Sequence, residues 1–230
     1  MIGIIGAMPI EVENIKTAMT DLKTEKKSMI KYHLGKLNGT PCVVAFSGGG
    51  KVNAAVCAQT MILDYNVKKI INVGVAGGLL DCMNTGDVVI SSGAVQYDVD
   101  TTALGDPLGL ISTINLINLP CDDTLREKAL KVLSERKTLN IYNGIIASGD
   151  KFISKKEELL NIKNNFGAVA CDMETGAISQ VCYLNSVSFL SVRVISDNIN
   201  KENSNLDYEK FKLYSAEIAC RTLKSIIKIL

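Results

Sequence analysis

The feature that most constrains the fold is a regular alternation between short apolar runs and longer amphipathic stretches. The apolar runs predict strands at residues 2–5, 41–46, 69–75, 87–91, 143–147, 168–171 and 188–195. The stretches between them predict helices at residues 9–19, 51–65, 122–135, 155–164, 175–184 and 208–229. Several runs are too continuously apolar for a sheet with one wet face, so helices should cover both faces. The sequence therefore predicts an α/β chain folded as a three-layer α/β/α sandwich.

The predicted sheet is mixed, and the chain predicts a single domain. The segment 37–40 (LNGT) is typical of a tight hairpin between two antiparallel strands, whereas the alternation elsewhere favours parallel pairing. No repeat, linker or low-complexity tract divides the 230 residues. We therefore expect one domain over residues 1–230.

Charge and hydropathy argue against two classes of partner. The formal net charge is +1, and the lysines are spread along the chain rather than gathered in a basic stripe, which disfavours nucleic acid and anionic membranes. No stretch approaches the roughly 20 apolar residues that cross a bilayer, and no basic leader opens the sequence. We expect a cytoplasmic protein with neither nucleic acid nor membrane as a partner.

The seven cysteines and the single histidine do not form a recognisable metal site. No two cysteines have CxxC spacing, and they lie within or beside apolar segments, which is typical of small core residues in a reducing compartment. His33 lies in a polar-apolar alternation typical of a strand, without a cysteine or histidine at ligand spacing. We therefore expect no metal and no cofactor, and an acid or base that is a carboxylate.

Two glycine-rich turns could bring the backbone close to a ligand. The segment 47–51 (SGGGK) is similar to a phosphate-binding loop, but that motif needs glycine where Ala45 stands and serine or threonine where Val52 stands. A side-chain-poor turn before an alanine-rich helix is the better interpretation. The segment 73–78 (VGVAGG) has the same character, and such turns allow a flat ligand to approach the main chain.

Glu11 lies in the first turn of a predicted helix. Pro9 suits the first helical position, and the helix dipole favours an acid in the opening turn. Helical spacing puts Glu11 on the same face as Ile15 and Ala18, which directs it toward the core. From this pattern alone, a dipole-stabilising glutamate and a functional glutamate both stay open.

Arg193 lies in a predicted strand that is otherwise apolar. By strand alternation it shares a face with Ile195 and Asp197. An unpaired buried guanidinium is costly, so a carboxylate should lie close, and the segment 172–174 (DME) offers one. A structural ion pair and a functional one are both compatible with this pattern.

Three carboxylates follow the ends of different predicted strands. They belong to Glu11, Glu174 and Asp197. Open α/β sheets bind ligands beyond the carboxyl ends of their strands, so these groups could converge on one pocket. Together with one arginine and glycine turns, they predict acid/base chemistry by carboxylates on a small polar ligand.

Six segments then point to a family. In order they read GIIGAMxxE, SGGGKVNAA, NxGxAGGL, SGDKFI, DMETGAI and RVISD. The chain resembles the 5'-methylthioadenosine/S-adenosylhomocysteine nucleosidases of the nucleoside phosphorylase/hydrolase superfamily, from Ile2 to the last helix. The resemblance implies an α/β/α sandwich around a mixed, curled sheet, assembled as a homodimer. It also implies an N-glycosyl hydrolase that needs no cofactor, releases adenine from the two named nucleosides and from 5'-deoxyadenosine, and serves methionine salvage and methyl-cycle detoxification.

The resemblance also implies roles for the three carboxylates. Glu11 would activate the attacking water, Asp197 would be the acid at adenine N7, and Glu174 would hold the ribose hydroxyls. The other substrate-binding positions would be Met8, Val75, Gly77, Phe152, Ile153, Met173, Arg193, Ser196 and Tyr208. Three residues would reach the pocket of the neighbouring subunit: Thr101, Leu104 and Asp106.

Three positions depart from the family's pattern. Val75 stands where many relatives have serine, Gly49 where a larger apolar residue is common, and Asp106 where an aromatic residue is common. The preference between the methylthio and homocysteinyl substrates therefore stays open.

Phosphorolysis is the main alternative within the superfamily. It must hold a phosphate dianion, but the first turn offers no arginine and Glu11 would repel phosphate. Water is therefore the predicted nucleophile. A purine nucleoside phosphorylase, an aminofutalosine-type nucleosidase and a non-catalytic nucleoside-binding protein stay as alternatives, although the last would have little need for Glu11 and Asp197 together with Glu174.

Overall fold

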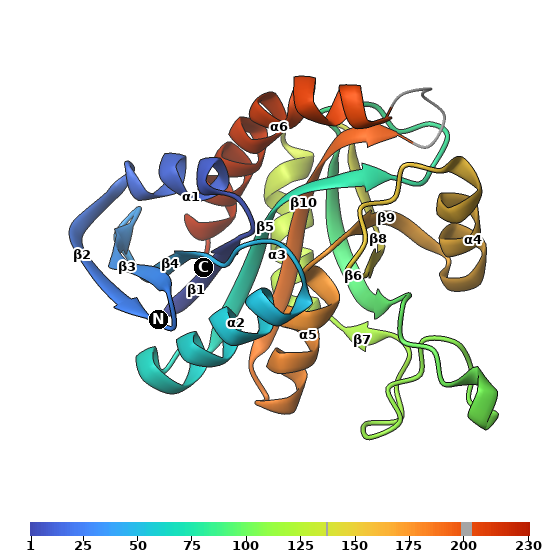
Figure 1. Cartoon of the computed structure of the whole chain (residues 1–230). Helices are drawn as coiled ribbons and strands as arrows, with labels where there is room; N and C mark the ends of the chain where they lie inside the picture. The colour runs from blue at the N-terminus through green and yellow to red at the C-terminus, as the bar shows by residue number, and fades with distance from the viewer. Residues whose placement is uncertain (137, 199–203) are drawn as a thin grey trace.

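Strands and helices alternate along the chain, as the sequence predicts (Figure 1). The structure is a computed structural model that describes residues 1–136, 138–198 and 204–230; the side chains of residues 204–210 and 212 lie outside the described part. The strands are β1 (Ile2–Gly6), β2 (Met19–Lys27), β3 (Ile30–Leu37), β4 (Thr40–Phe46), β5 (Lys69–Gly78), β6 (Val88–Gln96), β7 (Leu119–Pro120), β8 (Ile141–Ser148), β9 (Ala168–Asp172) and β10 (Ser188–Asn198). The helices are α1 (Pro9–Lys16), α2 (Lys51–Tyr65), the 3-10 helix η1 (Thr102–Leu104), α3 (Asp123–Ser134), α4 (Lys156–Phe166), α5 (Thr175–Leu184) and α6 (Ser204–Ile227).

One mixed sheet contains the strands of the described residues. Its order is β10-β6-β8-β9-β5-β1-β4-β3-β2, with β7 beside β6. Strand β1 is parallel to β4 and β5, whereas β3 and β4 form the antiparallel hairpin in which Leu37 faces Thr40. Strand β10 pairs with both β6 and β5, so part of the sheet closes on itself. The prediction of a mixed, curled sheet is confirmed.

Helices cover both faces of this sheet, which confirms the three-layer architecture. On one face α1, α3 and α6 share an apolar cluster that includes Ile15, Leu133 and Leu223. On the other face α2 and α5 share a second cluster around Cys57 and Ile178. Figure 1 shows α2 and α5 side by side, and α6 running along the opposite side of the strands. Burial of aliphatic side chains on both faces is the main stabilising contribution.

The structure corrects the end of the first predicted helix. Helix α1 ends at Lys16, and Met19 already begins β2. The prediction of a helix reaching residue 19 is therefore wrong, and β2 was not predicted. In the described residues β2 pairs with β3 alone, at the edge of the sheet, and its side chains are mostly exposed, so it carries no apolar run.

Three strands extend at least three residues beyond their predicted ends. Strand β5 continues to Gly78, β6 to Gln96 and β10 to Asn198, because hydrogen bonding persists past the apolar run; Asn198, for example, still pairs with Gly78. These extensions bring polar residues to the carboxyl ends of the strands. Among the described residues, no helix is long and apolar enough to span a membrane.

Candidate active site

The three carboxylates that follow strand ends face one pocket of about 250 Å³. Glu11 comes from α1, Glu174 from the start of α5 and Asp197 from β10, and all three are buried. Other predicted positions line the same pocket: Met8, Val75, Gly77, Phe152, Ile153, Met173, Arg193 and Ser196. The volume is close to the lower end of the roughly 300–1,000 Å³ usual for small-molecule sites.

Glu11 is held by backbone amides from two elements. Strand β1 ends at Gly6, and the chain turns into α1 at Pro9. The N–H groups of Ala7 and Met8 donate to Glu11 Oε2, at 2.7 and 2.9 Å, and the N–H of Val75 donates to Oε1 at 3.1 Å. The carboxylate therefore takes up the donors that a helix start would otherwise offer to an anion.

Burial dominates the protonation of Glu11. Removal from water raises the pKa of this carboxyl above its ordinary value, although the charge of Arg193 and the three amide hydrogen bonds oppose the shift. A carboxylate with a raised pKa is a stronger base than a free one. Glu11 therefore combines a fixed orientation with increased basicity.

Glu174 lies at the point where β9 leads into α5. Its Oε1 accepts a hydrogen bond of 3.0 Å from the N–H of Gly50, in the glycine turn before α2. Burial is the largest cause that raises the pKa of Glu174 to about 7; the charge of Arg193 opposes this, and Asp172 and Glu11 add to it. Glu174 can thus accept hydrogen bonds from hydroxyl groups in the pocket when it is ionised.

Asp197 lies near the end of β10, beside the glycine turn of β5. The pairing of β10 with β5 shifts between Ile195 and Asp197, which indicates a bulge at Ser196. The Ser196 hydroxyl donates to Asp197 Oδ1 at 2.7 Å. Because of the bulge both residues line the pocket, whereas Ile195, expected on the same face as Arg193 and Asp197, packs in an apolar cluster with Ala76.

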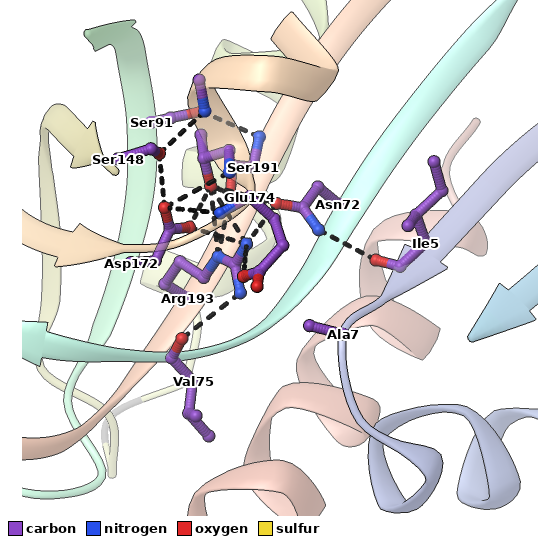
Figure 2. A network of polar contacts seen from close by, with 12 residues as sticks. Ile5, Ala7, Asn72, Val75, Ser91, Ser148, Asp172, Glu174, Ser191 and Arg193 are labelled. Carbon is purple, nitrogen blue, oxygen red and sulfur yellow. Dashed lines mark hydrogen bonds and ion pairs between the residues drawn. The ribbon is translucent and has the colours of Figure 1, made fainter. Parts of the chain in front are cut away.

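Arg193 is buried in a network of polar side chains (Figure 2). Its Nη2 lies 2.6 Å from Asp172 Oδ2 and 3.7 Å from Glu174 Oε2. It also donates to Asn72, Thr175 and Ser191 and to the carbonyl of Val75. The expected carboxylate partner of the buried guanidinium is therefore present, and Asp172 is the nearer of the two.

The opposite side of the pocket is more apolar and more open. The Phe152 side chain is 46% exposed, whereas Ile153 is buried. Several lining residues were not predicted as site residues: Ala7, Tyr97, Lys151, Cys171 and Asp172. Gly49 and Ala76 also line the pocket, and they belong to the two glycine-rich turns that were expected to approach a ligand. Tyr97 directly follows the extended end of β6, a position that the short predicted strand at residues 87–91 could not indicate.

The remaining predicted site residues lie elsewhere. Thr101, Leu104 and Asp106 belong to the segment between β6 and β7, which projects away from the sheet in Figure 1, and they do not line the pocket of their own chain. The Thr101 hydroxyl donates to Asp106 at 2.8 Å, and Leu104 is 83% exposed. Tyr208 belongs to α6, but its side chain is outside the described part. No cluster of histidine, cysteine and acidic side chains suited to a metal ion occurs within the described residues.

Comparison with known proteins identifies the family. A family model described as the phosphorylase superfamily matches residues 1–230. The 5'-methylthioadenosine/S-adenosylhomocysteine nucleosidase of Staphylococcus haemolyticus is 38% identical over 231 residues, and the match covers 100% of both chains. The chain belongs to the 5'-methylthioadenosine/S-adenosylhomocysteine nucleosidase family of the phosphorylase superfamily.

Solved structures agree with this membership. The nucleosidase of Neisseria meningitidis, in complex with methylthio-immucillin-A, has a TM-score of 0.95 and 31% identity, covering 100% of this chain and 99% of that one. The futalosine hydrolase of Helicobacter pylori has a TM-score of 0.94 and 32% identity, with coverage of 100% and 97%. As a member of this nucleosidase family the chain is an N-glycosyl hydrolase, and that prediction is confirmed.

Proposed function

We propose that this nucleosidase hydrolyses the N-glycosidic bond of 5'-methylthioadenosine and S-adenosylhomocysteine, and also that of 5'-deoxyadenosine. One observation carries the proposal: Glu11 occupies the amides at the start of α1, while Glu174 and Asp197 face the same pocket. The name of the Staphylococcus haemolyticus relative supports the substrate class. The products are adenine and the 5-substituted ribose, which fits a role in methionine salvage and methyl-cycle detoxification.

Each carboxylate has a separate task in the proposed reaction. Rupture of the bond builds positive charge on the sugar and negative charge on the departing base. Glu11 orients and deprotonates the water that attacks the anomeric carbon. Glu174 accepts hydrogen bonds from the ribose hydroxyls, and its negative charge beside the sugar stabilises the developing cation.

Asp197 supplies the proton for the leaving adenine. Its carboxyl delivers this proton to N7 as the glycosidic bond lengthens, and the hydrogen bond from Ser196 orients it. Free aspartate titrates near about 3.9, so the donor form requires burial against the purine to raise its pKa in the complex. Adenine N7 also becomes more basic as the bond stretches, which favours late proton transfer.

The remaining substrate contacts are assigned from the family resemblance and, except for that of Tyr208, from residues that line the pocket. Phe152 stacks on adenine, and the backbone of Ile153 reads its edge. Met173 and Arg193 frame the ribose; Met8, Val75 and Gly77 complete the lining, and Tyr208 closes over the nucleoside. The 46% exposure of Phe152 supports a stacking face that a ligand would cover.

Water is the proposed nucleophile rather than phosphate. A phosphate dianion would need the amides of Ala7, Met8 and Val75, which Glu11 already engages. It would also meet a buried carboxylate, with repulsion that a low local dielectric increases.

A second candidate substrate is an aminofutalosine-type nucleoside. The Helicobacter pylori structure that is similar over the full chain is called a futalosine hydrolase. Gly49 also leaves the pocket wall without a side chain, and a Cβ built there would meet only Glu174 Oε1, at 3.8 Å. A bulkier 5' substituent therefore has room at this position.

An adenine-release assay tests these roles. We expect Glu11→Gln and Asp197→Asn to fold and to bind adenine nucleosides, but to lose about 100-fold or more in kcat, since an acid or base contributes about 10²–10⁴-fold. The assay compares 5'-methylthioadenosine, S-adenosylhomocysteine and inosine in phosphate-free buffer. Glu13→Gln is the matched control, because Glu13 lies on the same helix but pairs with Lys16 at the surface.

Two results would contradict the proposal. Near wild-type adenine release by either variant would remove the assigned roles. Release that requires added phosphate, with ribose-1-phosphate rather than a free reducing sugar as product, would identify a phosphorylase.

We extend the proposal to the assembly and setting of the chain. A homodimer would bring Thr101, Leu104 and Asp106 to the partner's pocket. One domain over residues 1–230 is supported by a single sheet in the described residues; the three carboxylates come from β10 and from the starts of α1 and α5, two helices that cover this sheet. A cytoplasmic setting is supported by the seven cysteines, which are all free thiols.

A further inference from the structure

Asp172 is among the residues that line the pocket, but it has no role in the proposed reaction. It ends β9, two residues before Glu174, and its side chain is only 2% exposed. Figure 2 shows its carboxylate between Ser148 on one side and Arg193 on the other. A buried carboxylate with several charged neighbours, so close to residues that contact substrate, calls for a functional explanation.

One carboxylate oxygen of Asp172 pairs with the Arg193 guanidinium. Its Oδ2 lies 2.6 Å from Arg193 Nη2 and also accepts a hydrogen bond from the Thr175 hydroxyl. The same Nη2 is 3.7 Å from Glu174 Oε2, which is beyond hydrogen-bonding distance. The guanidinium is therefore paired with Asp172 rather than with Glu174.

The other oxygen of Asp172 holds the main chain at Glu174. Its Oδ1 accepts hydrogen bonds from the N–H groups of Glu174 and Thr175, at 3.3 and 3.2 Å, and from the Ser148 hydroxyl at 2.5 Å. These amides open α5 and have no intrahelical partner, so an aspartate side chain is a suitable acceptor. Asp172 thus fixes the backbone from which Glu174 projects into the pocket.

We propose that Asp172 is a positioning residue for hydrolysis, which fixes Glu174 through its main chain and offsets the charge of Arg193 that acts on Glu174 and Glu11. The inference rests on the proposed function, because it assigns these two glutamates to the reaction. Glu11 is included because it faces the same guanidinium: a Cβ built on Gly74 would lie 2.6 Å from Glu11 Oε1 and 2.5 Å from Arg193 Nη1, so the two charged groups approach each other over a residue without a side chain.

The charges around Asp172 agree with this assignment. Arg193 lowers the pKa of both Glu11 and Glu174, whereas Asp172 raises the pKa of Glu174. Tyr97 on the β6 side and Cys171 on β9 also face Asp172, but burial raises the pKa of each, so both are neutral near pH 7. The charge of Asp197 also raises the pKa of the Cys171 thiol. Asp172 is thus the negative charge that offsets Arg193 in this part of the wall.

The test is the pH dependence of kcat/KM for adenine release in Asp172→Asn. The amide keeps the shape but loses the charge, so Arg193 turns toward Glu174 and the pKa values of both glutamates fall. Since both must be ionised for hydrolysis, we expect the acidic limb to move to lower pH by about half a unit or more. We also expect kcat to fall about 10-fold or more, because small displacements of reacting groups are costly.

Two further variants separate charge, geometry and stability. Asp172→Glu restores the charge on a longer side chain, so the acidic limb should return to its wild-type position while kcat stays several-fold low. Asp87→Asn is the matched control: Asp87 is also buried, and it accepts hydrogen bonds from the Asn84 N–H at 2.8 Å and from the Asn140 amide at 3.0 Å, away from the pocket. It should lower thermal stability without moving the limb.

The outcomes distinguish this inference from the proposed function. No adenine release by the wild-type enzyme would overturn both. If the wild-type enzyme releases adenine but the acidic limb of the Asp172→Asn profile stays at its wild-type pH, the positioning role alone is overturned. A loss of kcat in Asp172→Asn that is equal at every pH would also overturn that role alone. If Asp172→Asn does not fold, Asp172→Glu decides: reduced kcat with an unmoved limb supports the role, and wild-type kcat overturns it.

Discussion

Glu174 shows how burial and neighbouring charges act in opposite directions on one carboxyl group. Its pKa is raised from 4.5 to about 7, with burial as the largest cause. The folded chain therefore binds this proton more tightly than the unfolded chain does. The stability that Glu174 contributes is present below about pH 4.5 and is lost as the pH rises toward 7.

We expect Glu174→Gln to remove this pH dependence. The stability of the variant relative to wild type should increase by roughly 3 kcal/mol between pH 4.5 and pH 8, because one pKa unit corresponds to about 1.36 kcal/mol. Denaturant unfolding at several pH values measures the difference. Glu127→Gln, at an exposed position on α3, should show no such trend. A constant difference between Glu174→Gln and wild type at every pH would contradict the expectation.

At the residue scale, the sequence predicts which carboxylates belong to the site better than it predicts their hydrogen-bond partners. Helical spacing directs Glu11 inward, and the end of a strand locates Glu174. The sequence could not indicate that the Glu11 carboxylate accepts a hydrogen bond from the N–H of Val75, since that contact joins residues 64 positions apart. Nor could strand alternation anticipate the bulge at Ser196, because a bulge depends on pairing with β5 rather than on local sequence.

At the scale of elements, the apolar runs predict the central strands and the amphipathic stretches predict the helices. Helices α2 and α5 begin and end where the pattern places them, because Gly50 and Glu174 precede clear helical periods. The edge strand β2 escapes prediction because its polar side chains face solvent. The two-residue strand β7 escapes it because so short a strand has no period to detect.

Strand β5 has no space for a side chain at Gly74, where it passes between β1 and β10. Gly74 pairs with Arg193 on β10, and a Cβ there would lie 2.5 Å from Arg193 Nη1 and 2.6 Å from Glu11 Oε1. We expect Gly74→Ala to push these two charged groups apart and to lower kcat for adenine release by about 100-fold, as misplacement of about 1 Å can do. Steady-state kinetics on the folded variant, checked by circular dichroism, measures this.

Gly144→Ala provides the matched control for that strand position. A Cβ on Gly144, in β8, would be equally crowded, but against the Val169 side chain at 2.6 Å. Overpacking an apolar contact should cost about 1–3 kcal/mol of stability while kcat is retained. Equal losses of kcat in the two variants would mean that strand distortion, rather than the charged pair, explains the effect of Gly74→Ala.

At the scale of the whole molecule, two exposed apolar regions support the proposed homodimer. The first is the segment between β6 and β7, where Leu104 is 83% exposed. The second is a face of α2, on which Val52, Val56 and Leu63 recur at helical spacing and remain exposed. Tyr183 and Leu184 of the adjacent helix α5 continue this face. Contiguous exposed apolar residues of this kind mark association surfaces.

Leu63→Glu tests whether this face joins two copies of the chain. Wild-type protein should sediment at twice the chain mass, and the variant at the chain mass, because a charge buried in an apolar interface is costly. Leu213→Glu is the control: Leu213 is 58% exposed on α6, away from this face, and its substitution should leave the dimer intact.

If Leu104 of one copy completes the pocket of the other, the monomeric variant should also show a higher KM for S-adenosylhomocysteine. The expected KM increase is several-fold, since a contact worth about 1.4 kcal/mol changes affinity 10-fold. A monomeric variant with wild-type KM would show that the pocket is complete within one chain, and a dimeric variant would place the interface elsewhere.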